Sequence, residues 1–137
     1  MYLRFVSPLT KGGRSRRCDI HMGIFQAAYE CRDEVDMPAW LHRQLIQEID
    51  WFKEYLPSPA EHHFDRTYVG HLNPNAICWF KASAKRFIEH AWTLKILIEE
   101  AGLPMSVIHT RQPGSISYQD KYQIVAYPLR TNLPRFG

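Results

Sequence analysis

The stretch that decides the predicted fold is NPNAICWFKASAKRFIEHAWTLKILIEEAG, residues 73–102. Its apolar residues recur at steps of three and four, which places them on one face of a helix: Ile77, Phe80, Ala84, Phe87, Ala91, Leu94 and Ile98. Asn73 can cap the start, and Pro74 is tolerated in a first helical turn. Gly102, followed closely by Pro104, is a stop signal. We therefore expect one long helix over residues 73–102.

Two shorter helices are expected before this stretch. Residues 20–30 form the first, with Ile24, Ala27, Ala28 and Cys31 on its inner side. The second begins near Asp36, a favourable N-cap, and tolerates Pro38 in its first turn. Its buried stripe is Leu41, Leu45, Ile49, Phe52 and Leu56, and Pro57 ends it.

Strands are expected at both ends of the chain. Residues 2–6 are rich in β-formers, and residues 105–110, 116–118 and 123–127 are three further short runs separated by turn residues. An N-terminal strand paired with a C-terminal meander, covered on one face by about three helices, is a simple two-layer solution. The sequence therefore predicts an α+β fold with a mostly antiparallel sheet, in a single domain over residues 1–137 that ends in a loose tail at 131–137.

Composition indicates an ordinary globular protein. The chain is 45% hydrophobic and 23% charged, and no apolar run approaches the roughly 20 residues of a membrane span. The short, quickly charged N-terminus does not resemble a signal peptide, so we expect a cytoplasmic, bacterial-type protein without membrane partners. Cys18, Cys31 and Cys78 match neither a disulfide framework nor a zinc motif.

The net charge of +3 is unevenly distributed along the chain. Residues 1–17 carry five Lys/Arg and no acid, and residues 102–137 carry four against Asp120 alone. If the two ends meet in one sheet, they form a shared basic surface. Such a surface favours an anionic partner, nucleic acid above all.

One candidate binding wall lies along the expected long helix. Trp79, Arg86 and His90 fall on the same edge of its apolar stripe, so Arg86 and His90 together could hold an anionic group. The alternative is that Trp79 packs at the helix boundary while the other two bond to neighbouring elements. Trp92, Ile96 and Leu97 fall off the stripe and would suit a homo-oligomeric contact.

Two basic regions are further candidates. Arg14, Arg16 and Arg17 follow two glycines, a composition that suits backbone and guanidinium contacts to phosphate but lacks the spacing of a P-loop. Arg111 and Tyr118, with Lys121 and Tyr122 nearby, belong to the C-terminal hairpin region, where basic and aromatic side chains could stack on single-stranded nucleic acid. The alternatives are a solvated loop and strand tyrosines that merely fit a pleated surface.

No cofactor or metal is expected. His62, His63, Asp65 and His71 supply metal-compatible atoms, but their spacing matches no metal motif, and exposed loop histidines are the simpler interpretation. Cys78 lies near the expected helix start, without a base beside it. A catalytic set is therefore not evident, and we lean towards a non-catalytic binding protein for nucleic acid or a protein partner.

The element order and the charge resemble small bacterial ribonuclease toxins of the RelE and ParE type, in which a few helices pack on an antiparallel sheet. This resemblance implies an alternative function, RNA cleavage by general acid–base chemistry. His90 or His109 would carry protons and Arg86 or Arg111 would stabilise phosphate. The chain departs from those proteins by being longer and by its extended third helix.

Overall fold

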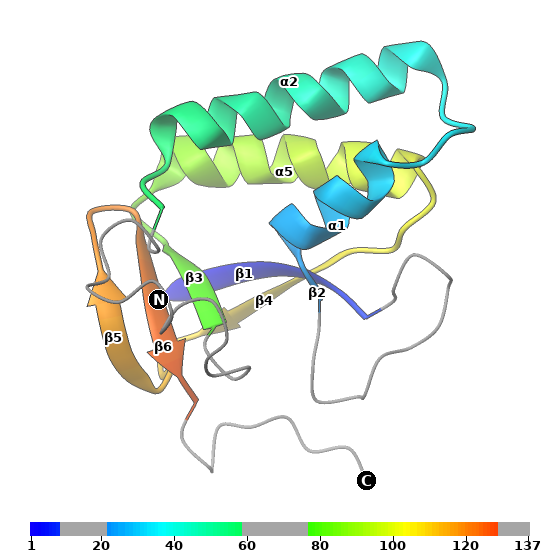
Figure 1. The fold of residues 1–137 in the computed structure, drawn as a ribbon. Coiled ribbons are helices and arrows are strands. Elements are labelled where there is room, and N and C mark those ends of the chain that lie inside the picture. The colour runs from blue at the N-terminus through cyan, green and yellow to red at the C-terminus, as the bar shows by residue number, and fades with distance from the viewer. Residues whose placement is uncertain (9–21, 59–76, 129–137) are drawn as a thin grey trace, which may run out of the picture.

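The computed structural model describes residues 1–8, 22–58 and 77–128. Within them, three helices cover one face of a curled antiparallel sheet, as Figure 1 shows. The helices are α1 (Ile24–Arg32), α2 (Ala39–Tyr55) and α5 (Lys85–Glu100). The strands are β1 (Tyr2–Ser7), β2 (Met22–Gly23), β3 (Ile77–Lys81), β4 (Ser106–Thr110), β5 (Ser115–Gln119) and β6 (Gln123–Tyr127). The predicted fold class, α+β with helices on a mostly antiparallel sheet, is confirmed.

The two ends of the chain meet in this sheet, as predicted. β1 pairs with β4 along residues 2–6, and β5 pairs with β6 as an antiparallel hairpin. Strand β3, which the sequence pattern did not predict, lies between β1 and β6 and joins the hairpin to the N-terminal strand. Within the described residues, β4 and β5 therefore form opposite edges of the sheet, so the predicted C-terminal meander is limited to the β5–β6 hairpin, because β4 pairs with β1 instead.

The single long helix expected over residues 73–102 was wrong in its first half. Residues 77–81 form β3, a turn follows at Ala82 and Ser83, and α5 begins only at Lys85. A short run of Ile, Cys, Trp and Phe suits a pleated strand as well as a helix, and pairing with β1 and β6 decides the outcome. The expected cap at Asn73 and the proline after it lie outside the described residues.

The boundaries of the other two helices also shift. The first helix begins at Ile24 rather than near residue 20, because Met22 and Gly23 pair with the end of β1. The second begins at Ala39, with Pro38 at its N-cap, so Asp36 is exposed and does not cap it. Asp36 lies two residues before Pro38, whereas an N-cap immediately precedes the first helical residue.

Most of the predicted helical stripe forms the main core. Leu41, Leu45, Ile49 and Phe52 of α2 and Phe87, Ala91, Leu94 and Ile98 of α5 are all buried, each at most 6% exposed. Leu97, expected to be a spare apolar residue, is also buried against this core, whereas Trp92 and Ile96 remain exposed. Trp92 is 43% and Ile96 57% exposed, which leaves an apolar surface on α5.

A second, smaller cluster lies on the opposite face of the sheet. Successive strand residues point to opposite faces, so Phe80 joins the helical core while Trp79 packs with Ile124 and Ala126. Both Ile124 and Ala126 are fully buried, as the alternation in residues 123–127 predicted for a shared face. Among the helices that the structure describes, none is long and apolar enough to cross a membrane.

Candidate functional site

The candidate site is an open cavity of about 410 Å³ at the start of α5. Three elements that are far apart in the sequence meet there: the end of α2, the first turn of α5 and the β5–β6 turn. The lining side chains are Tyr55, Ser83, Ala84, Lys85, Arg86, Phe87, Lys121 and Tyr122. Arg86, which was predicted to belong to a binding wall, lines this cavity.

The β5–β6 turn is held in place by backbone and side-chain hydrogen bonds. The amide of Lys81, the last residue of β3, donates to the carbonyl of Tyr122 at 2.8 Å. Asp120 accepts hydrogen bonds from the Tyr118 hydroxyl at 2.7 Å and from the Tyr122 amide at 2.7 Å. The ring of Tyr122 also packs on Phe87, with 4.4 Å between ring centroids. These contacts fix the turn, so Lys121 and Tyr122 lie next to the start of α5.

Arg86 is placed by aromatic rings of α2. Its guanidinium carbon lies 5.3 Å from the ring centroid of Trp51 and 5.3 Å from that of Tyr55. Both contacts are of the cation–π kind, which position the planar group while leaving its N–H edges available to an acceptor. Tyr55 itself is 47% exposed, so one aromatic surface borders the cavity in contact with water.

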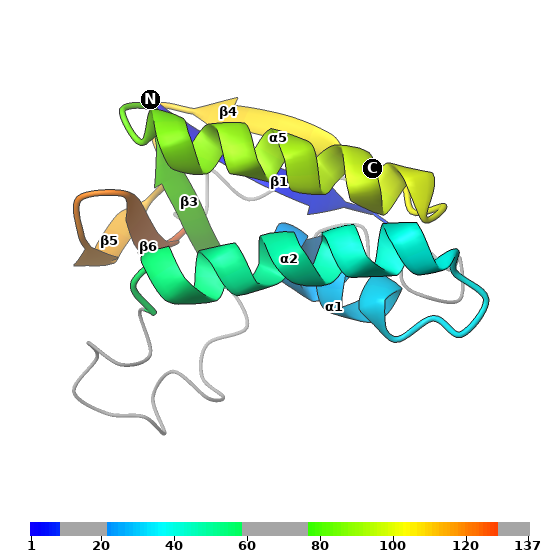
Figure 2. The same ribbon diagram turned by 90° about the horizontal axis from the view of Figure 1, so that it is seen from above.

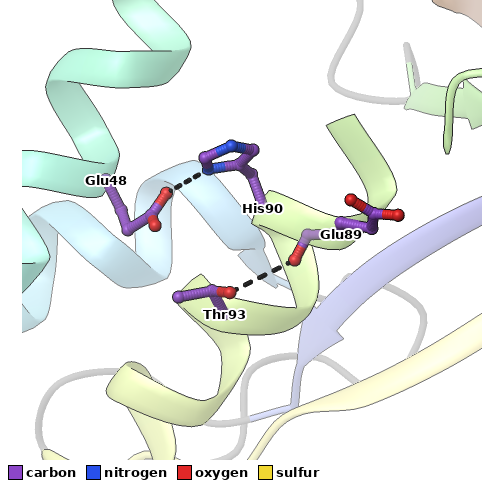
Figure 3. A network of polar contacts seen from close by, with 4 residues as sticks. All are labelled: Glu48, Glu89, His90 and Thr93. Carbon is purple, nitrogen blue, oxygen red and sulfur yellow. Dashed lines mark hydrogen bonds and ion pairs between the residues drawn. The ribbon is translucent and has the colours of Figure 1, made fainter. Parts of the chain in front are cut away.

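His90 supports this arrangement from one helical turn further along α5. Its ring stacks on Trp51 with centroids 3.5 Å apart and an angle of 10° between the planes. Its Nδ1 donates to the Glu48 carboxylate of α2 at 2.8 Å, as Figure 3 shows. His90 does not line the cavity. Its role in this geometry is to fix Trp51, which in turn positions Arg86.

The charge at this site has one sign. Lys85, Arg86 and Lys121 line the cavity, and the described residues of its lining include no Asp or Glu. The first turn of α5 carries no acid and no side-chain cap, so the positive end of the helix dipole adds to the same field. Within the described part of the chain, the side-chain ion pairs are Arg32–Asp33, His90–Glu48 and Lys95–Glu99, and none of them neutralises these three cations.

Trp79, predicted to belong to the same binding wall, does not reach this site. It lies on β3, is 9% exposed and packs on the opposite face of the sheet. It instead lines a separate cavity of about 220 Å³ together with Arg4 and Cys78. The predicted wall placed Trp79 on the same edge of one helix as Arg86 and His90. Because residues 77–81 form a strand, Trp79 no longer shares that edge.

The two hairpin candidates are not brought together. Arg111 is exposed just after β4, and Tyr118 lies on β5 at the other edge of the sheet. Desolvation, and then the hydrogen bond to Asp120, raises the pKa of Tyr118 to about 12. Lys121 and Tyr122 are the hairpin residues that do line the cavity, and sequence reasoning assigned them to a connecting turn. Their adjacency as a basic–aromatic pair was the available signal.

Several predicted residues lie outside the described ranges. They are the basic loop residues Arg14, Arg16 and Arg17 and the metal candidates His62, His63, Asp65 and His71. Among the residues that are described, no group of three or more His, Cys, Asp or Glu side chains could hold a metal ion. Cys31 is buried, and Cys78 is exposed on a strand rather than at a helix start.

Comparisons with known protein families, curated proteins and solved structures found no match for this chain. The geometry of the site is therefore the basis for a functional assignment.

Proposed function

We propose that the cavity at the start of α5 binds the phosphate groups of single-stranded nucleic acid. The observation that carries this proposal is the gathering of Lys85, Arg86 and Lys121 at the positive end of a helix, with no acid among the lining residues that the structure describes. Positive side chains at a helix N-terminus oppose folding, because this end of the helix carries a partial positive charge and favours anions. Local arrangements that oppose stability are expected mainly where function requires them.

The chemistry of the lining suits phosphate. An arginine offers several N–H donors in a planar fork, and two lysines add point charges around it. The free N–H groups of a helix N-terminus are a further anion-binding element. A phosphate placed in the cavity would relieve the mutual repulsion of the three cations.

The aromatic residues favour single-stranded nucleic acid over a small free anion. Tyr55 and Tyr122 border the cavity beside the cations, and Tyr55 is 47% exposed. Unpaired bases stack on exposed aromatic rings while cations hold the neighbouring phosphates. The cavity is open to solvent, so it suits a ligand that extends beyond it better than a small ligand enclosed on all sides.

The ribonuclease alternative receives no support from the placement of its candidate residues. His90 faces α2, whereas His109 lies on β4, and Figure 2 shows these two elements on opposite sides of α5. A proton donor and a proton acceptor must surround one phosphate. Binding without cleavage is the function that this geometry favours.

The test is fluorescence anisotropy with short labelled RNA and DNA oligonucleotides at a series of salt concentrations. The variants are Arg86→Gln and Lys121→Gln, and the matched controls are Arg43→Gln and Lys53→Gln on exposed positions of α2. The slope of log K against log salt is negative, and loss of one phosphate contact from single-stranded nucleic acid should make it less negative by about 0.7. The control variants should leave the slope unchanged.

A second variant separates stacking from charge. Tyr55→Leu should weaken binding by about 1–3 kcal/mol without changing the salt slope, because no phosphate contact is lost. The proposal is refuted if the wild-type protein shows no affinity at low salt, or if the controls weaken binding as much as the cavity variants. Inorganic phosphate that competes at low concentration would indicate a small-anion site instead, and shortened RNA would favour the ribonuclease alternative.

A further inference from the structure

One flank of α5 combines exposed apolar residues with a regular pattern of charge. Its residues, the α5 flank, recur at steps of three and four along the helix and so share one side: Lys85, Glu89, Trp92, Lys95, Ile96 and Glu99. Trp92 and Ile96 are 43% and 57% exposed. The flank faces away from α2, because Trp92 contacts Phe5 of β1 and His90 occupies the α2 side.

The charges on this flank are arranged symmetrically about Trp92. A two-fold axis through Trp92 would set two antiparallel copies of α5 side by side. It would place Lys85 opposite Glu99 and Glu89 opposite Lys95 of the other copy, in addition to the Lys95–Glu99 ion pair of 2.8 Å within each helix. Each opposed pair has opposite signs, and each occurs twice because of the symmetry. Trp92 would contact Trp92 of the other copy at the centre. Ile96 would contact the partly buried Ile88 of the other copy.

The same arrangement suits the helix dipoles. α5 carries basic residues in its first turn and Glu99 and Glu100 in its last, which is the reverse of the favourable distribution. In an antiparallel pair, the acidic end of one helix lies beside the positive end of the other. A charge pattern that is unfavourable within one chain becomes favourable between two.

The neighbouring edge of the sheet lacks the usual protection against pairing. β4 runs along the side of α5 that is remote from α2, as Figure 2 shows, and among the described residues it pairs only with β1. Its residues, Ser106–Thr110, include no Lys, Arg, Pro or Gly, and its register with β1 is regular. Exposed edges are normally blocked by charge, proline or a bulge. A partner on the α5 flank would also cover this edge.

We propose that this surface binds a second copy of the chain, in a symmetric dimer with antiparallel α5 helices that cross at Trp92. The self-complementary charge pattern selects a second copy over another partner. Lys85 belongs to both the α5 flank and the cavity, whereas Glu89 and Lys95 do not line the cavity, so variants at Glu89 and Lys95 test the dimer separately from the nucleic-acid site.

The test is a charge exchange measured by light scattering and sedimentation equilibrium. The wild-type protein should sediment at twice the chain mass of 16.1 kDa. Glu89→Lys and Lys95→Glu should each weaken the dimer by roughly tenfold, because each puts two like-charge pairs across the axis. The double variant, Glu89→Lys with Lys95→Glu, restores opposite signs and should return affinity to near the wild-type value.

Two further variants test the apolar centre. Trp92→Ala should weaken the dimer more than either charge variant, since large aromatic side chains dominate interface energies. Trp40→Ala on α2, which is 47% exposed, is the matched control and should have no effect. A wild-type protein that remains monomeric at roughly 100 µM would overturn the proposal. A double variant that stays as weak as the single ones would overturn it too, because the pairing of Glu89 with Lys95 would then be wrong.

Discussion

Asp120 organises the β5–β6 turn, and its replacement gives the sharpest test of the fold around the site. Its Oδ1 accepts from the amides of Tyr122 at 2.7 Å and Gln123 at 3.0 Å. Its Oδ2 accepts from the Tyr118 hydroxyl at 2.7 Å and from the Gln123 side chain at 3.0 Å. Asn keeps one acceptor oxygen, so Asp120→Asn retains the first pair and loses the second.

The expected cost at pH 7 follows from these two lost bonds. Hydrogen bonds to a charged group contribute about 1.5–3 kcal/mol each, and partial exposure together with easier desolvation of the neutral amide reduces the sum. We expect Asp120→Asn to lower the free energy of unfolding by about 2 kcal/mol. For a chain of this size the corresponding fall in melting temperature is roughly 5–10 °C.

The cost should depend on pH in a specific direction. Desolvation raises the pKa of Asp120, but the hydrogen bonds from Tyr118, Tyr122 and Gln123 outweigh it, so the pKa lies below its ordinary value of 3.8. A carboxyl with a lowered pKa in the folded state stabilises the protein above the unfolded pKa. That stabilisation is lost as the pH falls through the folded pKa. The difference between wild type and Asp120→Asn should therefore shrink below pH 4.

The assay is urea denaturation followed by circular dichroism at pH 7 and at several lower pH values. Asp50→Asn, an exposed position on α2, is the control and should change stability by less than about 0.5 kcal/mol. Equal stability of wild type and Asp120→Asn at pH 7 would refute the reasoning. A difference that persists unchanged at low pH would also refute it, because it would not come from the carboxylate.

Two further predictions concern single residues. Gly114 and Gly102 have φ angles of 113° and 99°, but a Cβ at Gly114 would overlap the backbone oxygen of Tyr127, whereas the space at Gly102 is open. Gly102→Ala should thus cost about 1–2 kcal/mol and Gly114→Ala roughly 3 kcal/mol or more in urea denaturation, and equal costs would contradict this packing. Desolvation, with Glu34 and Glu30 nearby, raises the pKa of the Cys31 thiol from 9.0 to about 11. Its alkylation by iodoacetamide at pH 8, followed by mass spectrometry, should be about a hundredfold slower than in the urea-unfolded chain, and comparable rates would argue against it.

The site was only partly predictable from sequence. Arg86 was correctly placed on a helix beside the apolar stripe, because that position is a local property of α5. Lys121 and Tyr122 were noted only as part of a basic and aromatic hairpin, and their meeting with α5 was not predicted, since nothing in a turn sequence reveals which helix it will face. Trp79 was misplaced because its assignment depended on continuing a helical period through residues that form a strand.

The sequence by itself determined the features that depend on near neighbours: the buried stripes of α2 and α5, the strand at residues 123–127, and the pairing of opposite chain ends implied by the order of elements. Local periodicity is sufficient for these, because residues three, four or two apart share a face whatever surrounds them. Tertiary structure alone decided that residues 77–81 are a strand, since a short apolar run takes the form that its partners β1 and β6 hydrogen-bond. It also decided the cationic cavity, because three segments with no local relation meet there only after the sheet and helices have packed.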